Sequence, residues 1–419
     1  MKKASIKHTR LLVATRTDGF GVRLLALMNA IALSDLTGIP FAFTWQDNKT
    51  TNPHHDVESA FYCFEKEFIH DHFLEDTDLN NFIEVSFSEI LDDNETKKPI
   101  FFRVQQSINL NHINDKKILT AIKKKNFQNI FNSIGFSGKN KRAISAAMDV
   151  FLTPGKVGIH LRAGDVVYGN FRNSPFYTNK AIPFPVIRKI VEARGPESCL
   201  LFCQDPSIDA VLQGTYPSLQ SSSILTCDEY DGVQRALFDI VLMSRCEEII
   251  AGRSGFSMVS AQISSLQIQE YLRLYQHKEI VAELAHWLND PESLKGIPDL
   301  QIAYAIMTGL RLDKDYLSRD MRRSCIEMGL ASDPENAFFH FLMIIELIEL
   351  DKNNADVYMR TLSKLDKAAL SKVIQFCCVH PTRYKDFLGQ GFEQILASNP
   401  CDASHALLSL IYDFRGDLR

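Results

Sequence analysis

The chain has little of what disulfide-stabilised and zinc-stabilised proteins depend on. Its nine cysteines are spread over 419 residues and follow no disulfide pairing pattern. It contains no C-x-x-C pair and no H-E-x-x-H motif, so we expect no structural zinc site. Cysteines without a pairing pattern are typical of reducing compartments, and we therefore expect a cytoplasmic protein.

Long apolar runs and an excess of basic charge are also missing. No run approaches the roughly 18 apolar residues of a membrane span, and the longest candidate, 338–350, is interrupted by polar and charged residues. The N-terminus resembles the start of a signal peptide, but its apolar part ends at 16–18 before any cleavage site. The net charge of −5 argues against a nucleic-acid partner. We expect a soluble protein with no transmembrane segment.

What is present is an ordinary globular composition, with 45% hydrophobic and 23% charged residues. The length predicts two or three domains. Residues 1–145 open with a strand at 11–14, a glycine-containing turn at 16–21, a helix at about 22–37 and a strand at 40–44. This order is typical of an α/β unit with parallel strands. The stretch 46–98 is poorly periodic, and we expect a long excursion with short helices there.

The second region, 146–275, alternates between the two kinds of element. We expect strands at 157–161, 199–203, 224–226 and 248–251, and helices at 185–193, 207–212, 232–244 and 257–264. Strands separated by helices of this length predict a doubly wound, mostly parallel sheet. Two such α/β halves in one chain suggest a cleft between them.

The third region, 276–419, shows no convincing strand, and we expect a helical extension there. Within 325–350 two helices flank the turn Ser332-Asp333-Pro334-Glu335-Asn336, in the manner of a tetratricopeptide helix pair. Only one such turn is clear, so a repeat array and a generic helical appendage both stay open. Either could bind a protein partner or mediate self-association.

The sharpest chemical signal is the segment Gly158 to Asp165. A buried strand delivers His160 and Arg162 to one face at its carboxyl end, where open α/β sheets bind ligands. Arginine offers a fixed fork of donors that suits a diphosphate. The alternative from spacing alone is an arginine that simply pairs with Asp165 at the strand end.

Two further turns precede helices. Asp18-Gly19-Phe20-Gly21 lets a ligand approach the backbone, but it lacks the third glycine of the dinucleotide fingerprint, and a tight structural turn explains it equally well. The stretch Asp239 to Ser257 runs from a helix through a strand into a hydroxyl-rich turn. Ser254 and Ser257 would suit a phosphate there, and ordinary helix capping is the alternative.

Together, in order and wording, these three segments resemble the fucosyltransferase superfamily, which includes bacterial and eukaryotic GDP-fucose-dependent enzymes. The resemblance covers roughly 10–265. His160, Arg162 and Asp165 match the H-x-R-x-x-D motif; Gly19-Phe20-Gly21 with Arg23 matches the opening loop; Asp205 follows a later strand as an acidic turn does in the family; and Asp239 through Ser257 matches the closing pattern. Ala163, Arg253 and Gly255 depart from it.

The resemblance implies a GT-B-like α/β fold with two Rossmann-like doubly wound domains facing a cleft and an all-helical region after them. In that fold 1–145 would form the acceptor-side domain and 146–275 the nucleotide-sugar donor domain. It implies a metal-independent, inverting transfer of fucose from GDP-fucose to a glycan, with no cofactor and with Arg162 at the β-phosphate as the catalytic contact. The implied donor-binding residues are Gly19, Phe20, Gly21, Arg23, His160, Asp165, Asp205, Asp239, Arg253, Ser254, Phe256 and Ser257.

Several choices stay open at this point. The acceptor would be a bacterial surface polysaccharide or a glycolipid, a choice that follows from cellular logic rather than from residues. The donor could be another GDP- or UDP-sugar, or the chain could be a degenerate enzyme that acts as a binding scaffold through its helical tail. His54, His55, Asp56 and Glu65 are candidates for the catalytic base, and nothing selects among them.

Overall fold

A computed structural model describes residues 9–46, 57–92, 98–107, 113–169, 171–313, 316–362, 368–374 and 392–416. The chain forms two compact units, each assembled from separate stretches of sequence. Unit 1 contains Met1–His160, Pro196–Cys203 and Ser218–Glu270, and unit 2 contains Leu161–Gly195, Gln204–Pro217 and Tyr271–Arg419. This grouping cuts across the three sequence ranges expected above, whose boundaries remain a prediction.

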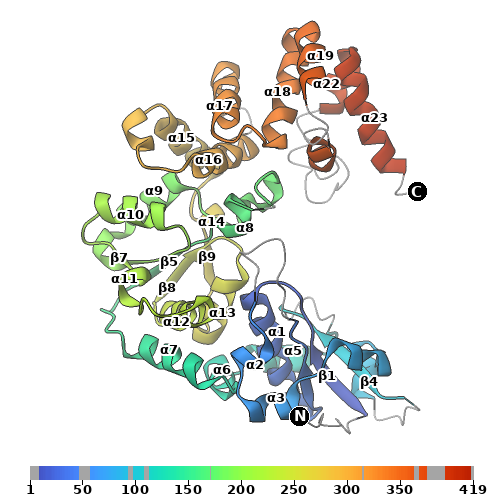
Figure 1. Ribbon diagram of the computed structural model, residues 1–419, viewed down its shortest axis with the longest axis vertical. Helices are drawn as coiled ribbons and strands as arrows, with labels where there is room; N and C mark the ends of the chain where they lie inside the picture. Colours follow the sequence, from blue (N-terminus) through green and yellow to red (C-terminus); the bar gives the residue numbers. More distant parts are fainter. Residues whose placement is uncertain are drawn as a thin grey trace. The chain divides into compact units, whose positions relative to one another are not determined.

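Unit 1 holds two parallel sheets (Figure 1). The first has the order β2-β1-β4-β3, with β1 (Arg10–Ala14), β2 (Phe41–Phe43), β3 (Ile83–Glu84) and β4 (Ile100–Val104). Helix α1 (Phe20–Thr37) follows β1, and it ends at Gly38, which adopts a left-handed φ of 71° and donates its N–H to the carbonyl of Ser34. A φ of that sign favours glycine, so the predicted helix stop is confirmed.

The excursion after β2 contains short helices, as predicted, but it also supplies strands β3 and β4, which the sequence pattern does not indicate. The helices of this region are α2 (Ala60–Cys63), α3 (Lys66–His72), η2 (Asp76–Asn81), α4 (Phe87–Leu91), α5 (Lys116–Lys123), α6 (Phe127–Ser133) and α7 (Gly138–Asp149). Strand β4 lies beside β1 in register from Arg10 opposite Ile100 to Ala14 opposite Val104.

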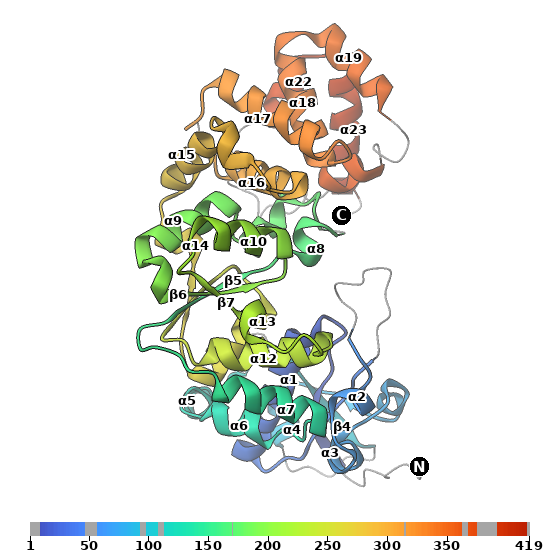
Figure 2. The same ribbon diagram turned by 60° about the vertical axis from the view of Figure 1, so that its left-hand side comes forward.

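The second sheet has the order β7-β6-β5-β8-β9, and β5 pairs with β8, β6 with β7, and β8 with β9, all in parallel. Its strands are β5 (Val157–Leu161), β6 (Cys199–Cys203), β7 (Gln220–Ser221), β8 (Glu248–Ala251) and β9 (Ile268–Glu270). Helices α12 (Gly232–Ser244) and α13 (Gly255–Ser264) pack together beside β8 and β9, as Figures 1 and 2 show. The predicted doubly wound sheet is confirmed.

One predicted strand is wrong. Residues 224–226 lie at the end of a short helix, α11 (Ser222–Leu225), and the strand of this region is β7, a few residues earlier. The Ser221 hydroxyl accepts the N–H of Ser223 and so caps α11, which ends the strand at that residue. Local capping by serine outweighs the β-branched character of Ile224.

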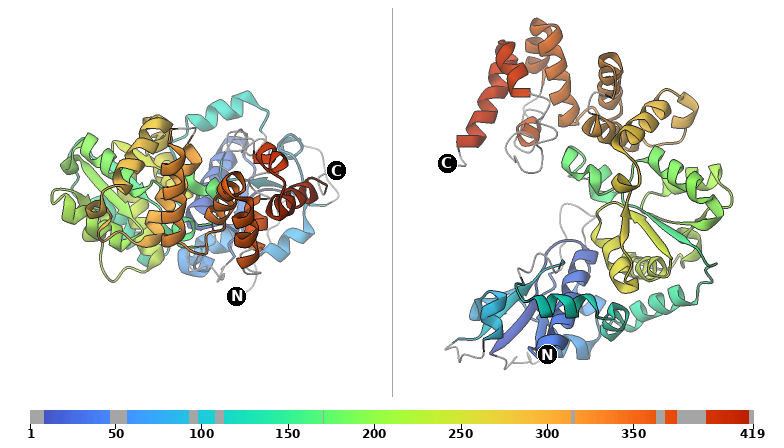
Figure 3. Two further views of the ribbon diagram at one scale, coloured as in Figure 1. Left: turned by 90° about the horizontal axis from the view of Figure 1, so that it is seen from above. Right: turned by 180° about the vertical axis from the view of Figure 1, so that it is seen from behind.

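Unit 2 is helical throughout its described residues. It contains α8 (Gly164–Val167), η4 (Pro175–Asn179), α9 (Phe184–Arg194), α10 (Pro206–Thr215), α14 (Tyr271–Leu274), α15 (His277–Leu288), η6 (Pro291–Leu294), α16 (Asp299–Leu312), α17 (Arg319–Ser332), α18 (Ala337–Leu350), α19 (Lys352–Thr361), α22 (Phe392–Ser398) and α23 (Asp402–Gly416). Helices α15 to α19 each pack against the next in chain order (gold to orange-red in Figure 3), and α22 packs against α23. The helical region and the helix pair around Asp333 are confirmed.

Helix α1 is also the one helix of the described residues that is long and apolar enough to cross a membrane by length and composition. A search for an uninterrupted apolar run does not find it, because polar residues are spaced along the helix. Two thirds of the window, 67%, is buried inside the protein, and residues 24–33 of the helix are all buried. Burial of this kind is what the core helix of a globular domain shows.

Candidate functional site

Strand β5 delivers His160 to the point where the second sheet reverses its strand order. The chain moves outward through β6 and β7, then returns to the other side of β5 to form β8 and β9. His160 lies opposite Ala251 of β8 at the carboxyl ends of both strands. In open α/β sheets, ligands bind outside the carboxyl ends at such a reversal. The geometry therefore marks the carboxyl ends of β5 and β8, at His160 and Ala251, as a candidate site.

His160 is buried, and its ring stacks on Phe256 at the start of α13, with 5.1 Å between ring centroids and 19° between planes. The contact joins two residues that the sequence motifs mark in segments nearly a hundred positions apart. It fixes the first turn of α13 against the end of β5. Through this stacking contact, His160 helps to determine how the start of α13 packs against the end of β5.

Two glycines bring the starts of α1 and α13 into direct contact. A Cβ on Gly21 would lie 2.8 Å from the carbonyl carbon of Gly255 and 2.8 Å from the nitrogen of Phe256. A Cβ on Gly255 would lie 2.6 Å from Cγ2 of Val22. Only residues without a side chain allow this approach. Gly255, a departure from the family pattern, is explained by this contact.

The close approach has an electrostatic consequence. Each helix presents unpaired N–H groups and a partial positive charge at its N-terminus. Helix α1 begins after β1, at the reversal between β1 and β4 in the first sheet, and α13 begins after β8 in the second. Two such N-termini side by side suit an anion such as a phosphate.

Ser254 and Ser257 occupy the turn that starts α13. The Ser254 hydroxyl accepts the N–H of Phe256 at 3.3 Å, and the Ser257 hydroxyl donates to the carbonyl of Ser254 at 3.1 Å. Both side chains are buried. The capping alternative is therefore what the structure shows for Ser254, and a phosphate would meet backbone N–H groups here before it met these hydroxyls.

Arg23 holds the opening loop together. Its guanidinium is buried and donates to the carbonyls of Thr17, Asp18 and Gln46, and it lies over the ring of Trp45 at 5.3 Å. These contacts fix the turn on both sides of Gly19. Gly19 is the residue before α1 and has open space around its Cα, while the ring of Phe20 meets Trp45 edge-on at 5.8 Å.

Arg162 follows β5 and pairs with Asp165. Its Nε lies 3.0 Å from Oδ1 of Asp165, and its Nη2 lies 2.7 Å from both carboxylate oxygens. The side chains are 17% and 4% exposed. The pairing alternative is what the structure shows, and Nη1 remains directed to no described residue. A guanidinium held on two nitrogens has a fixed orientation, which leaves its third nitrogen as the donor that a ligand can use.

Asp205 caps α10 and is enclosed. Its Oδ1 accepts the N–H groups of Ser207 and Ile208, and its Oδ2 accepts the hydroxyl of Tyr168 and the side-chain amide of Gln301 at 2.8 Å. All these atoms belong to unit 2. The sequence motif marks Asp205 as a donor-binding residue. The structure places both of its oxygens on protein donors instead.

Three interacting residues near Asp205 are absent from the sequence-based set. Gln204 accepts the N–H of Ala163 through its side chain at 3.2 Å and donates its own N–H to the carbonyl of Leu161. Tyr168 and Gln301 bond to Asp205 as described above. Gln204 stands beside a residue that the motif did mark, whereas Gln301 lies within a mostly apolar helix and gives no local signal.

Two further motif residues, Asp239 and Arg253, differ in their surroundings. Asp239 is half-buried on α12. Arg253 precedes Ser254, is 58% exposed, and pairs with Glu270 at 2.9 Å. Arg253 can therefore bind an anion only if its guanidinium first separates from Glu270.

The base candidates divide into two groups. His54, His55 and Asp56 lie outside the described residues. Glu65 precedes α3, and its carboxylate pairs with Lys141 at 2.7 Å on the surface of unit 1. Glu65 therefore has a structural partner, and the catalytic base stays unassigned.

A separate cavity of about 570 Å³ lies at the edge of the first sheet. Its lining mixes acidic and neutral polar groups with apolar ones (Glu84, Val85, Ser86, Phe87, Ser88, Leu91, Asp92, Phe102, Arg103, Gln105, Asn114 and Asp115). Arg103 is paired with Glu84 through two contacts of 2.8 Å, which lowers the pKa of Glu84. The remaining carboxylates, Asp92 and Asp115, leave the lining acidic, so it disfavours phosphates and suits a neutral or cationic ligand rich in hydroxyls.

The cavity is connected to the opening loop. The side-chain oxygen of Gln105 accepts Nη1 of Arg16 at 2.7 Å, and Arg16 pairs with Asp18, the residue before Gly19. Gln105 also accepts the side chain of Asn29 through its carbonyl. The cavity and the start of α1 are therefore neighbouring parts of one edge of the first sheet.

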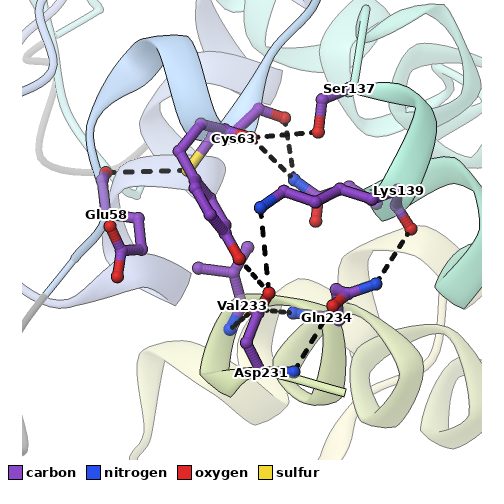
Figure 4. Close-up of polar contacts among 9 residues, drawn as sticks. Glu58, Cys63, Ser137, Lys139, Asp231, Val233 and Gln234 are labelled. Atoms are coloured by element: carbon purple, nitrogen blue, oxygen red, sulfur yellow. Dashed lines mark hydrogen bonds and ion pairs between the residues drawn. The ribbon is translucent and has the colours of Figure 1, made fainter. Parts of the chain in front are cut away.

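A second polar cluster joins the two sheets' helices within unit 1. Asp231 caps α12 and accepts the hydroxyl of Tyr62 from α2, and Lys139 of α7 approaches it at 3.9 Å (Figure 4). Cys63 lies beside it, and burial raises the pKa of this thiol to about 12. The cluster ties α2, α7 and α12 together.

No group of three or more histidine, cysteine, aspartate or glutamate side chains lies close enough to hold a metal ion among the residues described. Metal independence stays an expectation.

Comparisons by sequence find nothing: no family model and no curated protein matches the chain. Comparisons by structure find fucosyltransferases. The fucosyltransferase NodZ from Bradyrhizobium aligns with a TM-score of 0.37 and 16% identity over 60% of this chain and 92% of its own. Arabidopsis thaliana FUT1 in complex with GDP gives 0.41 and 13% over 64% and 72%, and POFUT1 in complex with GDP gives 0.35 and 10% over 62% and 96%. TM-scores at this level leave the assignment to the chain's own residues.

Proposed function

We propose that this chain is an inverting glycosyltransferase that transfers a sugar, fucose from GDP-fucose, to a glycan acceptor. The observation that carries the proposal is the arginine held at the end of β5. Asp165 occupies two nitrogens of Arg162 and leaves the third for a ligand. A preorganised cation at the oxygen that gains charge lowers the barrier to departure of a diphosphate.

The paired starts of α1 and α13 support the same interpretation. They supply backbone N–H groups for an anion without a metal ion, at the reversal points of two parallel sheets. His160 and Phe256 shape this corner, Asp165 positions Arg162, and Arg23 fixes the opening loop. Arg253 could add a phosphate contact on release from Glu270, which unchanged donor affinity in Arg253→Ala would exclude.

The choice of fucose and GDP comes from the motif resemblance, with Arg162 as its centre. Structures of NodZ soaked with GDP-fucose and of POFUT1 in complex with GDP-fucose are known. GDP and GDP-fucose are therefore the first ligands to test on this chain. A GT-B arrangement of two halves around a cleft, metal independence and a role in surface-polysaccharide or glycolipid synthesis belong to the proposal. The seven described cysteines are free, which fits a cytoplasmic enzyme.

We place the acceptor in the acidic cavity beside Gln105. Hydroxyl-rich sugars are recognised by carboxylate, amide and hydroxyl groups of the kind that line it. Its negative lining separates the two substrates, because it disfavours the diphosphate that the helix N-termini attract. Asp115→Asn with Asp92→Asn should raise the KM for the acceptor and leave that for the donor unchanged.

The experiment that tests the function is a thermal-shift panel of GDP, GDP-fucose, GDP-mannose, UDP and UDP-sugars. A ligand at about a hundred times its Kd adds roughly 2.7 kcal/mol of stability, enough to shift Tm by several degrees. We expect GDP and GDP-fucose to stabilise the protein, with and without EDTA. Stabilisation by UDP compounds alone would overturn the donor, and no shift with any nucleotide would favour a binding scaffold.

Arg162→Ala leaves Asp165 buried without its cation, so loss of binding in that variant could reflect unfolding. Arg162→Lys is the better variant because it keeps a positive charge beside Asp165 while it removes the planar set of guanidinium N–H donors. The matched control is Arg322→Lys, which likewise keeps a positive charge beside a buried aspartate. Arg322 is 25% exposed and pairs with a buried aspartate, Asp313, at 2.9 Å elsewhere in unit 2. We expect the control to retain nucleotide binding.

A further inference from the structure

The segment that follows Arg162 belongs to the same compact unit as the C-terminal helices. Residues Leu161–Gly195 group with Tyr271–Arg419, while β5 up to His160 belongs to the unit that contains the sheets. The helices after β9 therefore form part of the body that holds the arginine, and they do more than extend the chain. Polar contacts join them, and several involve buried side chains.

The first contact runs from α16 to the short helix that carries Asp165. Gln301 of α16 is 6% exposed and donates to Oδ2 of Asp205 at 2.8 Å. The same oxygen accepts the hydroxyl of Tyr168, the residue that ends α8. Asp205 is thus a bridge between α16 and α8, and its Oδ1 is already used to cap α10.

From Tyr168 the path to the arginine is one helical turn. The N–H of Tyr168 donates to the carbonyl of Gly164 at 2.9 Å, and the carbonyl of Asp165 accepts the N–H of Phe171 at 3.0 Å. A Cβ on Gly169 would lie 2.8 Å from the Cα of Asp165, so this turn is closely packed. A displacement of Tyr168 must move Asp165 and with it the guanidinium of Arg162.

Further along, the segment is fixed at Thr178. The hydroxyls of Tyr271 and Tyr304 donate to the Thr178 carbonyl at 2.7 and 2.8 Å, and Nη1 of Arg311 donates to its hydroxyl at 2.6 Å. Thr178 is fully buried, and burial raises the pKa of Tyr304 well above its ordinary value. The Tyr304 hydroxyl therefore stays a protonated donor throughout the working pH range.

A third anchor lies at the turn between α17 and α18. Arg172 approaches Asp333 at 3.4 Å and Glu335 at 2.6 Å, and the side chain of Asn336 donates to the Arg172 carbonyl at 3.4 Å. Asp333 and Asn336 are the buried residues of the Asp-Pro-Glu-Asn turn. The turn that suggested a helical repeat therefore contacts the Arg162 segment.

We propose that Gln301 is a positioning residue for Arg162, acting through Asp205 and Tyr168, and that the C-terminal helices set the orientation of the diphosphate-binding arginine. The inference rests on the proposed function for its catalytic readout. It assigns the helical region a role within the enzyme rather than in recruitment of a partner. A misplacement of about 1 Å in such a group can cost about 10²-fold in rate.

The test compares Gln301→Leu with Thr308→Val. Thr308 lies on the same helix, is fully buried, and donates its hydroxyl to the carbonyl of Tyr304 in its own helix. Each variant removes one buried polar group from α16. We expect Gln301→Leu to lower kcat for GDP-fucose transfer 10- to 100-fold with the donor KM within about threefold, and Thr308→Val to leave kcat within about threefold. Equal loss in both variants would overturn the proposal.

A double-mutant cycle with Arg162→Lys separates positioning from general damage. If Gln301 acts through Arg162, Gln301→Leu should lower kcat less than about threefold in the Arg162→Lys background. Full multiplication of the two losses would contradict the proposal. Wild-type turnover in Arg162→Lys alone would instead overturn the proposed role of Arg162, and so distinguishes the two failures.

Hydrogen exchange supplies a readout that does not depend on activity. The amides of Val167 and Tyr168 donate to carbonyls in the α8 turn. They should exchange at least about tenfold faster in Gln301→Leu than in Thr308→Val at equal global stability. Equal exchange in the two variants would show that Gln301 does not hold α8, whatever reaction the chain performs.

Discussion

Two regions of the molecule, one in each unit, are built in opposite ways. In unit 1 the starts of α1 and α13 meet through Gly21 and Gly255, where the absence of side chains permits contact between backbones. In unit 2 Asp165 holds Arg162, the backbone turn of α8 joins Asp165 to Tyr168, and Tyr168 and Gln301 both donate to Asp205. At the contact in unit 1, any added side-chain atom would clash with backbone. In unit 2, the loss of a polar side chain would remove a hydrogen bond that holds Arg162 in place. A substitution that adds volume should therefore damage the region in unit 1, and a substitution that removes a polar group should damage the region in unit 2.

The largest stability effect is expected at Gly21. Gly21→Ala forces a Cβ to within 2.8 Å of two backbone atoms that cannot rotate away, so α1 and α13 must separate. We expect a loss of about 1–3 kcal/mol in the free energy of unfolding, measured by urea denaturation. Gly138→Ala is the control, because Gly138 starts α7 with nothing within 4 Å. An equal effect of the two changes would contradict the close contact.

Gly329→Ala should cost less than Gly21→Ala, about 1–2 kcal/mol. Its Cβ would lie 2.7 Å from the ring of Phe339, which is a side chain and can yield, unlike the backbone at Gly21. In a Phe339→Leu background the added methyl should cost measurably less. Strict additivity of the two changes would show that α17 and α18 do not pack at this glycine.

The buried thiols predict a pH effect of intermediate size. Burial raises the pKa of Cys63 and Cys246 to about 12 from an ordinary 9.0, so the unfolded state loses these protons first. The stabilisation is complete below about pH 9 and declines as the pH rises toward the raised pKa, by about 1 kcal/mol per thiol over the first pH unit. Cys63→Ala with Cys246→Ala should flatten this part of the stability profile. An unchanged slope would be inconsistent with their burial.

The smallest effect is expected at Gly214 of α10, where a Cβ would have no neighbouring atom within 4 Å. Gly214→Ala should stabilise the protein by about 0.5–1 kcal/mol, because alanine lowers the entropy of the unfolded chain and favours the helix. Thermal unfolding checks the sign. A loss of stability would mean that α10 is packed more tightly at this residue than the structure shows.

Local patterns predicted the parts of the fold that rest on local causes. Strands β5, β6 and β8 and helix α12 follow directly from hydrophobic periodicity and from glycine and proline stops. Strand β4 was missed because Ile100 to Val104 follows a polar excursion without a clear turn signal, and β7 because serine capping decides two residues. Both depend on pairing with distant strands, which a local window does not contain.

The candidate site divides along the same line. The motifs marked His160, Arg162, Gly21 and Ser254, since each follows a strand or ends one. That Asp205 faces Gln301 rather than a ligand depends on a helix almost a hundred residues away. The contact between Gly21 and Gly255 likewise joins two helices that follow strands of different sheets. The sequence of a single segment does not predict such contacts.

The most direct test of the central claim is release of GDP from GDP-fucose by the wild-type chain and by Arg162→Lys, with Arg322→Lys as the control. We predict turnover by wild type and control, and a loss of about 10²- to 10³-fold in Arg162→Lys, as expected when one contact to a developing charge is removed. Turnover that is unchanged in Arg162→Lys, or absent from the wild type across the GDP-sugars that stabilise it, would contradict the claim.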